Sequence, residues 1–169
     1  MSKKYIFDLD NTLVYTDFLN NKSYNYALNL LGYKKIDIDG RINRDTIISF
    51  FPELNLFERE ELIKLKQEFF LKNLALIKPN EYTIQFLRLQ KCENCILWTS
   101  ADLNRVIAIL EYYKIKDNFL EIIQSKKCNI EDDIRIICEI FDCKEDCLIF
   151  LEDNDIIVQK LKEQNLTVY

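Results

Sequence analysis

Residues 6–14 read IFDLDNTLV, in which an apolar run passes directly into two aspartates, Asp8 and Asp10. The run over residues 4–9 predicts a short buried strand. Carboxylates two positions apart share one face of an extended segment, and at the carboxyl end of a parallel strand they reach the crevice where ligands bind. Two like charges held so close favour a bound cation, and such oxygen ligands suit Mg²⁺ at a phosphate site better than zinc. Taken alone, the pair is also typical of solvated acids at the end of a strand.

Short apolar runs and helical patterns continue along the rest of the chain. Further strands are predicted over residues 95–99, 120–123, 147–151 and 166–169, and helices over 102–113, 131–141 and 156–164. Strands that alternate with helices of this length predict an α/β fold, with a parallel sheet covered by helices on both faces.

The segment over residues 15–79 differs, because it contains no convincing strand and its periodicity is helical. Helices are predicted over residues 18–31, 43–51 and 56–76, the last with Leu62, Leu65, Phe69 and Leu76 facing inward. A crossover between parallel strands needs only about a dozen residues, so this much longer segment is predicted to be an inserted all-helical domain. Residues 1–14 and 80–169 would then form one discontinuous core domain.

The ends of the later predicted strands carry polar side chains of three kinds. Hydroxyls follow the second strand, lysines follow the third and carboxylates follow the fourth. These residues are Thr99 and Ser100, Lys126 and Lys127, and Glu152 and Asp153. Each pair alone also fits a helix cap or a solvated surface. Their occurrence at successive strand ends in this order, together with the Asp-x-Asp pair, favours a site for a metal and a phosphate group.

The series Asp-x-Asp-x-Thr, Thr or Ser, Lys and Glu-Asp resembles the haloacid dehalogenase (HAD) superfamily, and within it the Mg²⁺-dependent phosphatase branch. The resemblance covers essentially the whole chain, and IFDLDNTLV at residues 6–14 is its most specific motif. It implies a Rossmann-like core, and it implies that residues 15–79 form the small helical cap of the first type. These are expectations about fold and domain organisation.

The resemblance also implies roles for individual residues. Asp8 would attack phosphorus and form an aspartyl-phosphate, and Asp10 would protonate the leaving alkoxide and later deprotonate water. Thr99, with Ser100 beside it, would hold the phosphoryl group. Either Lys127 or Lys126 would stabilise the negative charge.

Mg²⁺ is the cofactor that the resemblance implies. Asp8, the backbone carbonyl of Asp10 and Asp153 would hold the ion, supported by Glu152. This chemistry suits a chain that contains no histidine.

Two departures from the family pattern bear on the site. Asn11 stands where the family most often has glycine. The third motif reads Lys126-Lys127-Cys128 where the family has Lys-Pro, so the motif lysine is ambiguous. Asn129 is predicted to cap the following helix, and because the family's lysine lies two positions before that cap, Lys127 is favoured.

The predicted function is therefore a Mg²⁺-dependent phosphomonoester hydrolase that acts on a small phosphorylated metabolite. A phosphomutase or phosphotransferase of the same fold is an alternative, and a catalytically silent HAD-fold binding protein is another. Arg41 and Arg44, between predicted helices of the insertion, are candidates for contacting an anionic substrate. Solvated loop arginines are the more common finding.

Composition narrows the classes of partner. The chain has 169 residues and a formal net charge of −5, which gives no basic field for a nucleic-acid polymer. No apolar run reaches the length of a membrane span, and no cleavable signal precedes the first strand, so we expect a cytoplasmic protein without a membrane partner. With no histidine, Ser-His-Asp and Cys-His catalysis are excluded.

Six cysteines raise the question of a metal site. Their positions are 92, 95, 128, 138, 143 and 147, which includes one C-x-x-C pair. A zinc site or a disulfide is the less favoured interpretation, because Cys95 and Cys147 open apolar runs where a thiol behaves as a small hydrophobic side chain.

Overall fold

The computed structural model describes residues 2–169, and their contacts divide into two compact units. The core unit comprises the chain up to Val14 together with Pro79–Tyr169, and the helical unit is Tyr15–Lys78. The chain passes between them at β2 (Val14–Tyr15) and β3 (Lys78–Pro79), which pair as a two-stranded sheet. The sequence analysis found no strand in this region, because a two-residue strand is too short to show a pattern.

The core unit is built on a five-stranded sheet in the order β5-β4-β1-β6-β7, in which every neighbouring pair is parallel. Its strands are β1 (Lys4–Phe7), β4 (Cys95–Thr99), β5 (Glu121–Gln124), β6 (Leu148–Leu151) and β7 (Thr167–Val168). The central strand is β1, and its last residue, Phe7, pairs with Leu97 of β4 and Leu151 of β6. The predicted α/β fold with a parallel sheet is confirmed.

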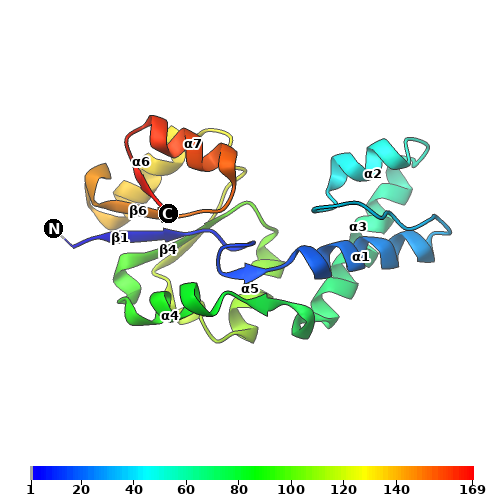
Figure 1. Ribbon diagram of the computed structural model, residues 1–169, viewed down its shortest axis with the longest axis horizontal. Helices are drawn as coiled ribbons and strands as arrows, with labels where there is room; N and C mark the ends of the chain where they lie inside the picture. The colour runs from blue at the N-terminus through cyan, green and yellow to red at the C-terminus, as the bar shows by residue number, and fades with distance from the viewer. Residues whose placement is uncertain (1) are drawn as a thin grey trace. The chain divides into compact units, whose positions relative to one another are not determined.

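Helices cover the sheet on both faces (Figure 1). They are α4 (Glu81–Leu89), α5 (Leu103–Tyr112), α6 (Ile130–Phe141) and α7 (Asp155–Glu163). Single 3₁₀ turns are η2 (Cys92–Asn94), η3 (Lys116–Asn118) and η4 (Glu145–Cys147). The sequence analysis did not identify α4, which Asn80 caps through a hydrogen bond from the Thr83 amide.

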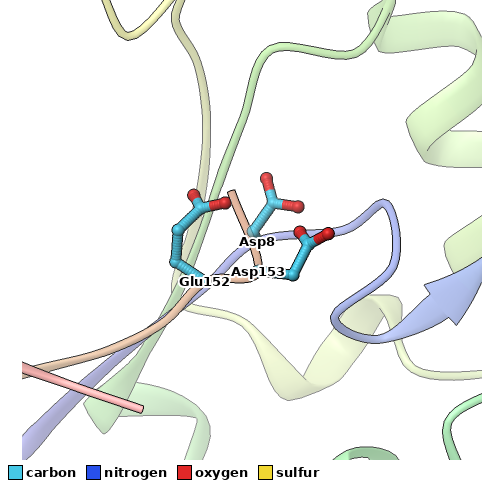
Figure 2. A group of neighbouring side chains, drawn as sticks. All are labelled: Asp8, Glu152 and Asp153. Atoms are coloured by element: carbon cyan, nitrogen blue, oxygen red, sulfur yellow. The ribbon is translucent and has the colours of Figure 1, made fainter. Parts of the chain in front are cut away.

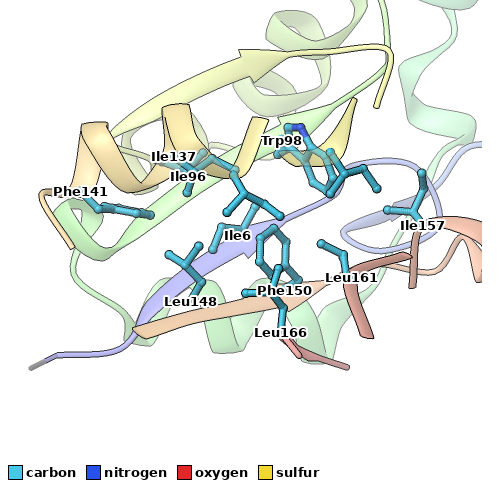
Figure 3. Packing of buried hydrophobic residues seen from close by; sticks show 12 residues of the cluster. Ile6, Ile96, Trp98, Ile137, Phe141, Leu148, Phe150, Ile157, Leu161 and Leu166 are labelled. Atoms are coloured by element: carbon cyan, nitrogen blue, oxygen red, sulfur yellow. The ribbon is translucent and has the colours of Figure 1, made fainter. Parts of the chain in front are cut away.

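Alternation along the strands sends side chains to the two faces in turn. On one face, β-strand residues pack against α6 and α7 in one buried cluster (Figure 3). The strand residues of this cluster are Ile6, Ile96, Trp98, Leu148 and Phe150. On the other face, Phe7 contacts the rings of Phe86 and Phe119. The strands are thus buried from both sides, which explains their nearly continuous apolar sequences.

The helical unit contains α1 (Asp17–Leu30), α2 (Arg44–Phe50), α3 (Leu56–Lys72) and the turn η1 (Leu74–Leu76). The prediction of one helix over 56–76 was wrong in its end, because Leu76 belongs to the separate turn η1. Of the residues predicted to face inward, Leu62 is buried and Leu65 packs against the same buried cluster, whereas Phe69 and Leu76 are half-buried. The helix ends at Lys72, and its buried residues are Leu62, Lys66 and Phe70. Lys66 keeps its place on the buried stripe because its ammonium group lies over the ring of Tyr24, 5.0 Å from the centroid.

The first strand is shorter than predicted, because the chain turns immediately after it. Asn11 adopts the left-handed conformation (φ 62°), and its amide donates to the Val14 carbonyl at 2.7 Å. Asparagine is among the few residues that tolerate this conformation, which explains how it replaces glycine here. Among residues 2–169, no helix is both long and apolar enough to cross a membrane.

Candidate active site

The polar residues predicted at the strand ends come from four segments of the core unit. Asp8 follows β1, Thr99 ends β4, Lys127 lies three residues beyond β5 and Glu152 follows β6. In a parallel sheet these carboxyl ends lie along one edge, at the crevice where ligands bind. The register explains why they meet, since the Asp8 amide donates to the Leu151 carbonyl at 2.9 Å and thereby ties the ends of β1 and β6 together.

Lys127 joins two of the carboxylates. Its ammonium nitrogen lies 2.7 Å from Asp8 Oδ1 and 2.5 Å from Glu152 Oε2, and all three side chains are buried. Lys126, in contrast, is exposed. Of the two candidate lysines, the structure therefore brings only Lys127 to Asp8.

Asp8 is a carboxyl group in an unusual environment. Burial raises the pKa of Asp8 to about 7, although the charge of Lys127 acts in the opposite direction. The nearby Glu152 and Asp10 carboxylates raise it further. The carboxylates around Asp8 therefore outnumber the one ammonium group that contacts it.

Asp8, Glu152 and Asp153 form one acidic group at the ends of β1 and β6 (Figure 2). One carboxylate oxygen of each lies within 4.8 Å of the others, and among residues 2–169 no other set of acidic or cysteine side chains is so arranged. Burial, followed by the charge of Glu152, raises the pKa of Asp153. Crowded oxygen donors of this kind fit a hard cation such as Mg²⁺.

Asp10 lies apart from that group and pairs with Arg105 of α5, whose side chain is almost fully buried. Sequence reasoning missed Arg105. The signal was an arginine in the first turn of α5, the helix that follows β4. There the amide of Arg105 donates to the N-cap residue Asp102. The pair fixes the orientation of the Asp10 carboxylate.

The two hydroxyl residues after β4 separate in the structure. Thr99 is buried, and its Oγ1 accepts a hydrogen bond from the Ala101 amide at 3.2 Å. Ser100 is exposed, and the helix begins later, at the N-cap Asp102. The backbone carbonyl of Thr99 accepts from the Ser125 amide at 2.9 Å, which ties the end of β4 to the segment that carries Lys127.

Arg41 and Arg44 both belong to the helical unit. Arg41 Nη1 lies 2.5 Å from Asp17 Oδ1 and 2.9 Å from Thr16 Oγ1, so it is paired within its own unit. Arg44 is the first residue of α2 and is exposed. Their predicted contact with a substrate stays a prediction.

The six cysteines lie within residues 2–169, and the structure has each of them as a free thiol. Burial raises the pKa of the Cys95 thiol to about 12 and that of Cys138 to about 11. Thiols of this kind stay protonated near neutral pH and are poor metal ligands.

The raised pKa of Asp8 predicts a pH dependence of stability for the metal-free protein. The folded state keeps a proton on Asp8 up to about pH 7, whereas an unfolded aspartate releases it near its ordinary value of 3.8. Folding stability therefore falls as pH rises through this interval. Asp8→Asn removes the titration, so in EDTA the melting temperature of the variant relative to wild type should rise by roughly 5 °C between pH 5 and pH 8. The control Asp117→Asn, at an exposed site, should follow wild type. Parallel curves for all three proteins would show that Asp8 does not titrate in this range.

No family model matches the sequence, and no curated protein matches it either. Several solved structures, in contrast, are similar to this chain in fold. The structure is similar to that of a predicted phosphoglycolate phosphatase from Haemophilus somnus 129PT, with a TM-score of 0.84, 17% identity and coverage of 99% of this chain and 84% of that one. For CbbY from Rhodobacter sphaeroides in complex with phosphate, the TM-score is 0.72 at 18% identity, with 99% and 85% covered.

A HAD-superfamily hydrolase of subfamily IA from Geobacter sulfurreducens gives a TM-score of 0.74 at 14% identity, again with 99% of this chain and 85% of that one covered. At these identities the likeness concerns the fold. The chain has the fold of HAD-superfamily hydrolases over nearly its whole length.

Proposed function

We propose that this chain is a Mg²⁺-dependent phosphomonoester hydrolase that acts through an aspartyl-phosphate on a small phosphorylated metabolite. The observation that carries the proposal is the buried Lys127 ammonium between Asp8 and Glu152, beside the acidic group with Asp153. A nucleophilic carboxylate, a fixed cation and oxygen ligands for a second cation are what attack on a phosphate ester requires. That similar solved structures are described as phosphatases supports the same class of reaction.

The chain's own residues account for each bond that changes. A carboxylate oxygen of Asp8 bonds to phosphorus while the ester P–O bond breaks, and Asp10 gives its proton to the departing alkoxide. Asp10 then takes a proton from the water that attacks the aspartyl-phosphate, which releases phosphate and restores Asp8. Lys127 and the Thr99 hydroxyl stabilise charge on the phosphoryl oxygens. When bound by Asp8 and Asp153, with the Asp10 carbonyl, Mg²⁺ adds further neutralisation of that charge.

We also propose that the helical unit acts as the cap that selects the leaving group, with Arg41 and Arg44 as candidates for anionic groups of the substrate. Arg41 would have to exchange its pairing with Asp17 for one with the substrate, whereas Arg44 is exposed. The net charge of −5 argues for a small substrate and against a nucleic-acid polymer.

The test is a phosphatase screen over sugar phosphates, nucleoside monophosphates and small phosphoacids, with and without Mg²⁺. At least one substrate should release inorganic phosphate, and EDTA should lower the rate by roughly 100-fold or more until Mg²⁺ is added back. Circular dichroism of the EDTA-treated protein controls for unfolding. Full activity after chelation would exclude the metal dependence. Transfer of the phosphoryl group to an acceptor that becomes a new phosphate ester, seen by ³¹P NMR without release of phosphate, would indicate a phosphomutase or phosphotransferase. If no substrate is turned over at all, the protein would be a catalytically silent binding protein.

A further inference from the structure

We infer that Trp98, Asp133 and Ser125 are positioning residues for Lys127, with the indole ring of Trp98 as the surface against which the ammonium group rests. The inference rests on the proposed function and adds to it, because it concerns how the charged group beside Asp8 is held in place. It rests on contacts among four residues from β4, the segment after β5 and α6.

The first contact is between the ammonium and the aromatic ring. Lys127 Nζ lies 4.3 Å from the centroid of the Trp98 ring, within the range of a cation–π interaction, and tryptophan is the best aromatic partner for a cation. Both residues are buried: Trp98 is 1% exposed and Lys127 is 6% exposed. Water therefore does not screen the attraction between them. Asp8 and Glu152 accept two hydrogen bonds from the same ammonium.

The second feature is that one carboxylate holds both the ring and the loop. Asp133 lies in the first turn of α6 and is buried. Its Oδ2 accepts a hydrogen bond from Trp98 Nε1 at 3.1 Å and another from Ser125 Oγ at 2.6 Å. A buried carboxylate with two donors fixes the rotation of the indole ring and the position of the serine at once.

The third feature is the backbone of Lys127 itself. Its amide donates to Ser125 Oγ at 3.0 Å, and its φ of 54° lies in the left-handed region that a lysine seldom adopts. The same hydroxyl that binds Asp133 therefore holds Lys127 in this conformation. Asp133 thus acts on Lys127 twice, through Ser125 on the main chain and through Trp98 on the side chain.

A lysine needs such support more than most residues. Its four-carbon stem is flexible and its ammonium is a point charge without directional geometry, so free rotation would move the charge away from the reacting atoms. A charge that stabilises a transition state must be held in place before the reaction. Loss of the support should therefore lower kcat more than it raises KM.

The kinetic test compares two substitutions at Trp98. Trp98→Leu removes the aromatic surface and should lower kcat by roughly 30-fold, with KM changed by less than about threefold. Trp98→Phe keeps an aromatic ring, so its kcat should stay within roughly fivefold of the wild-type value. Asp133→Asn and Ser125→Ala should also lower kcat selectively. The matched control is Phe141→Leu, which also replaces an aromatic ring by leucine in the same buried cluster, but at the last residue of α6 and at the opposite end of the cluster from Trp98 (Figure 3).

A readout independent of activity uses the fact that Trp98 is the sole tryptophan of the chain. Its indole N–H gives one peak in a ¹H–¹⁵N spectrum of the whole protein. Lys127→Met and Asp133→Asn should each move this peak by several line widths, whereas Lys126→Met, at an exposed neighbour, should leave it in place.

The outcomes separate the inference from the proposed function. Equal kcat losses in Trp98→Leu, Trp98→Phe and Phe141→Leu, or an indole peak indifferent to Lys127→Met, would overturn the positioning role. If the wild-type protein hydrolyses no phosphomonoester, the proposed function fails and the positioning role fails with it. The contact between Lys127 and the ring is then still decided by the indole peak alone.

Discussion

Asp8→Asn should lower kcat/KM for any phosphomonoester by roughly 10³-fold or more, because the amide cannot attack phosphorus and no second nucleophile lies in its place. The protein should stay folded. Asparagine has the same shape as aspartate, and the substitution removes one of the three carboxylates that crowd together with Glu152 and Asp153. Steady-state phosphate release at saturating Mg²⁺, together with the melting temperature, measures both effects.

The control for this variant is Asp117→Asn, which makes the same chemical change at an exposed residue of η3. It should keep wild-type rates. Rates within about tenfold of wild type in a preparation of Asp8→Asn that is free of wild-type enzyme would exclude Asp8 as the nucleophile.

Lys127→Met should lower kcat by roughly 10²-fold or more, because it removes the fixed positive charge beside Asp8. Methionine keeps the length and apolar character of the stem, so the contact surface with Trp98 changes little. Lys126→Met makes the identical change at the adjacent, exposed lysine and should stay within about twofold of wild type. The measurement is kcat for each variant at saturating Mg²⁺.

The loss of Lys127 also leaves Asp8 and Glu152 buried without their shared counter-charge, so the metal-free variant should melt at a lower temperature. Melting in EDTA therefore accompanies the kinetics and shows that the protein is folded at the assay temperature. A larger kcat loss in Lys126→Met than in Lys127→Met would mean that the motif lysine had been assigned to the wrong neighbour.

The placement of the strand-end residues could be predicted because parallel topology carries the information. Once Asp8, Thr99 and Glu152 are each placed after a strand of one parallel sheet, their meeting at one edge follows. The choice of Lys127 over Lys126 needed the position of the following helix; in the structure Lys127 is buried and Lys126 is exposed. The shortness of β1 and the two-residue strands β2 and β3 could not be predicted, since backbone turns and not side-chain pattern set these limits.

Residues that act through long-range contacts left no such signal. Arg105 lies 95 positions from Asp10 in the chain, and Asp133 lies 35 positions from Trp98. In sequence, an arginine and an aspartate in the first turn of a helix are typical of solvated surface positions. Only the packing of α5 and α6 against the sheet turns them inward. Lys66 was missed for the same reason, because a lysine on an apolar stripe is ordinarily assigned to solvent.

The crossing of the chain at β2 and β3 has a consequence for the order in which the protein folds during synthesis. The buried cluster of the helical unit draws all its residues from one continuous segment, between Tyr24 and Leu65, so its contacts are complete early. The central strand β1 is made before the other strands of its sheet, and its partners β4 and β6 begin only at Cys95 and Leu148. Until both have left the ribosome, the apolar side chains of β1 have no sheet to join. The first strand made is thus among the last to be enclosed, and nascent chains that stop before β6 expose it to chaperones and to aggregation.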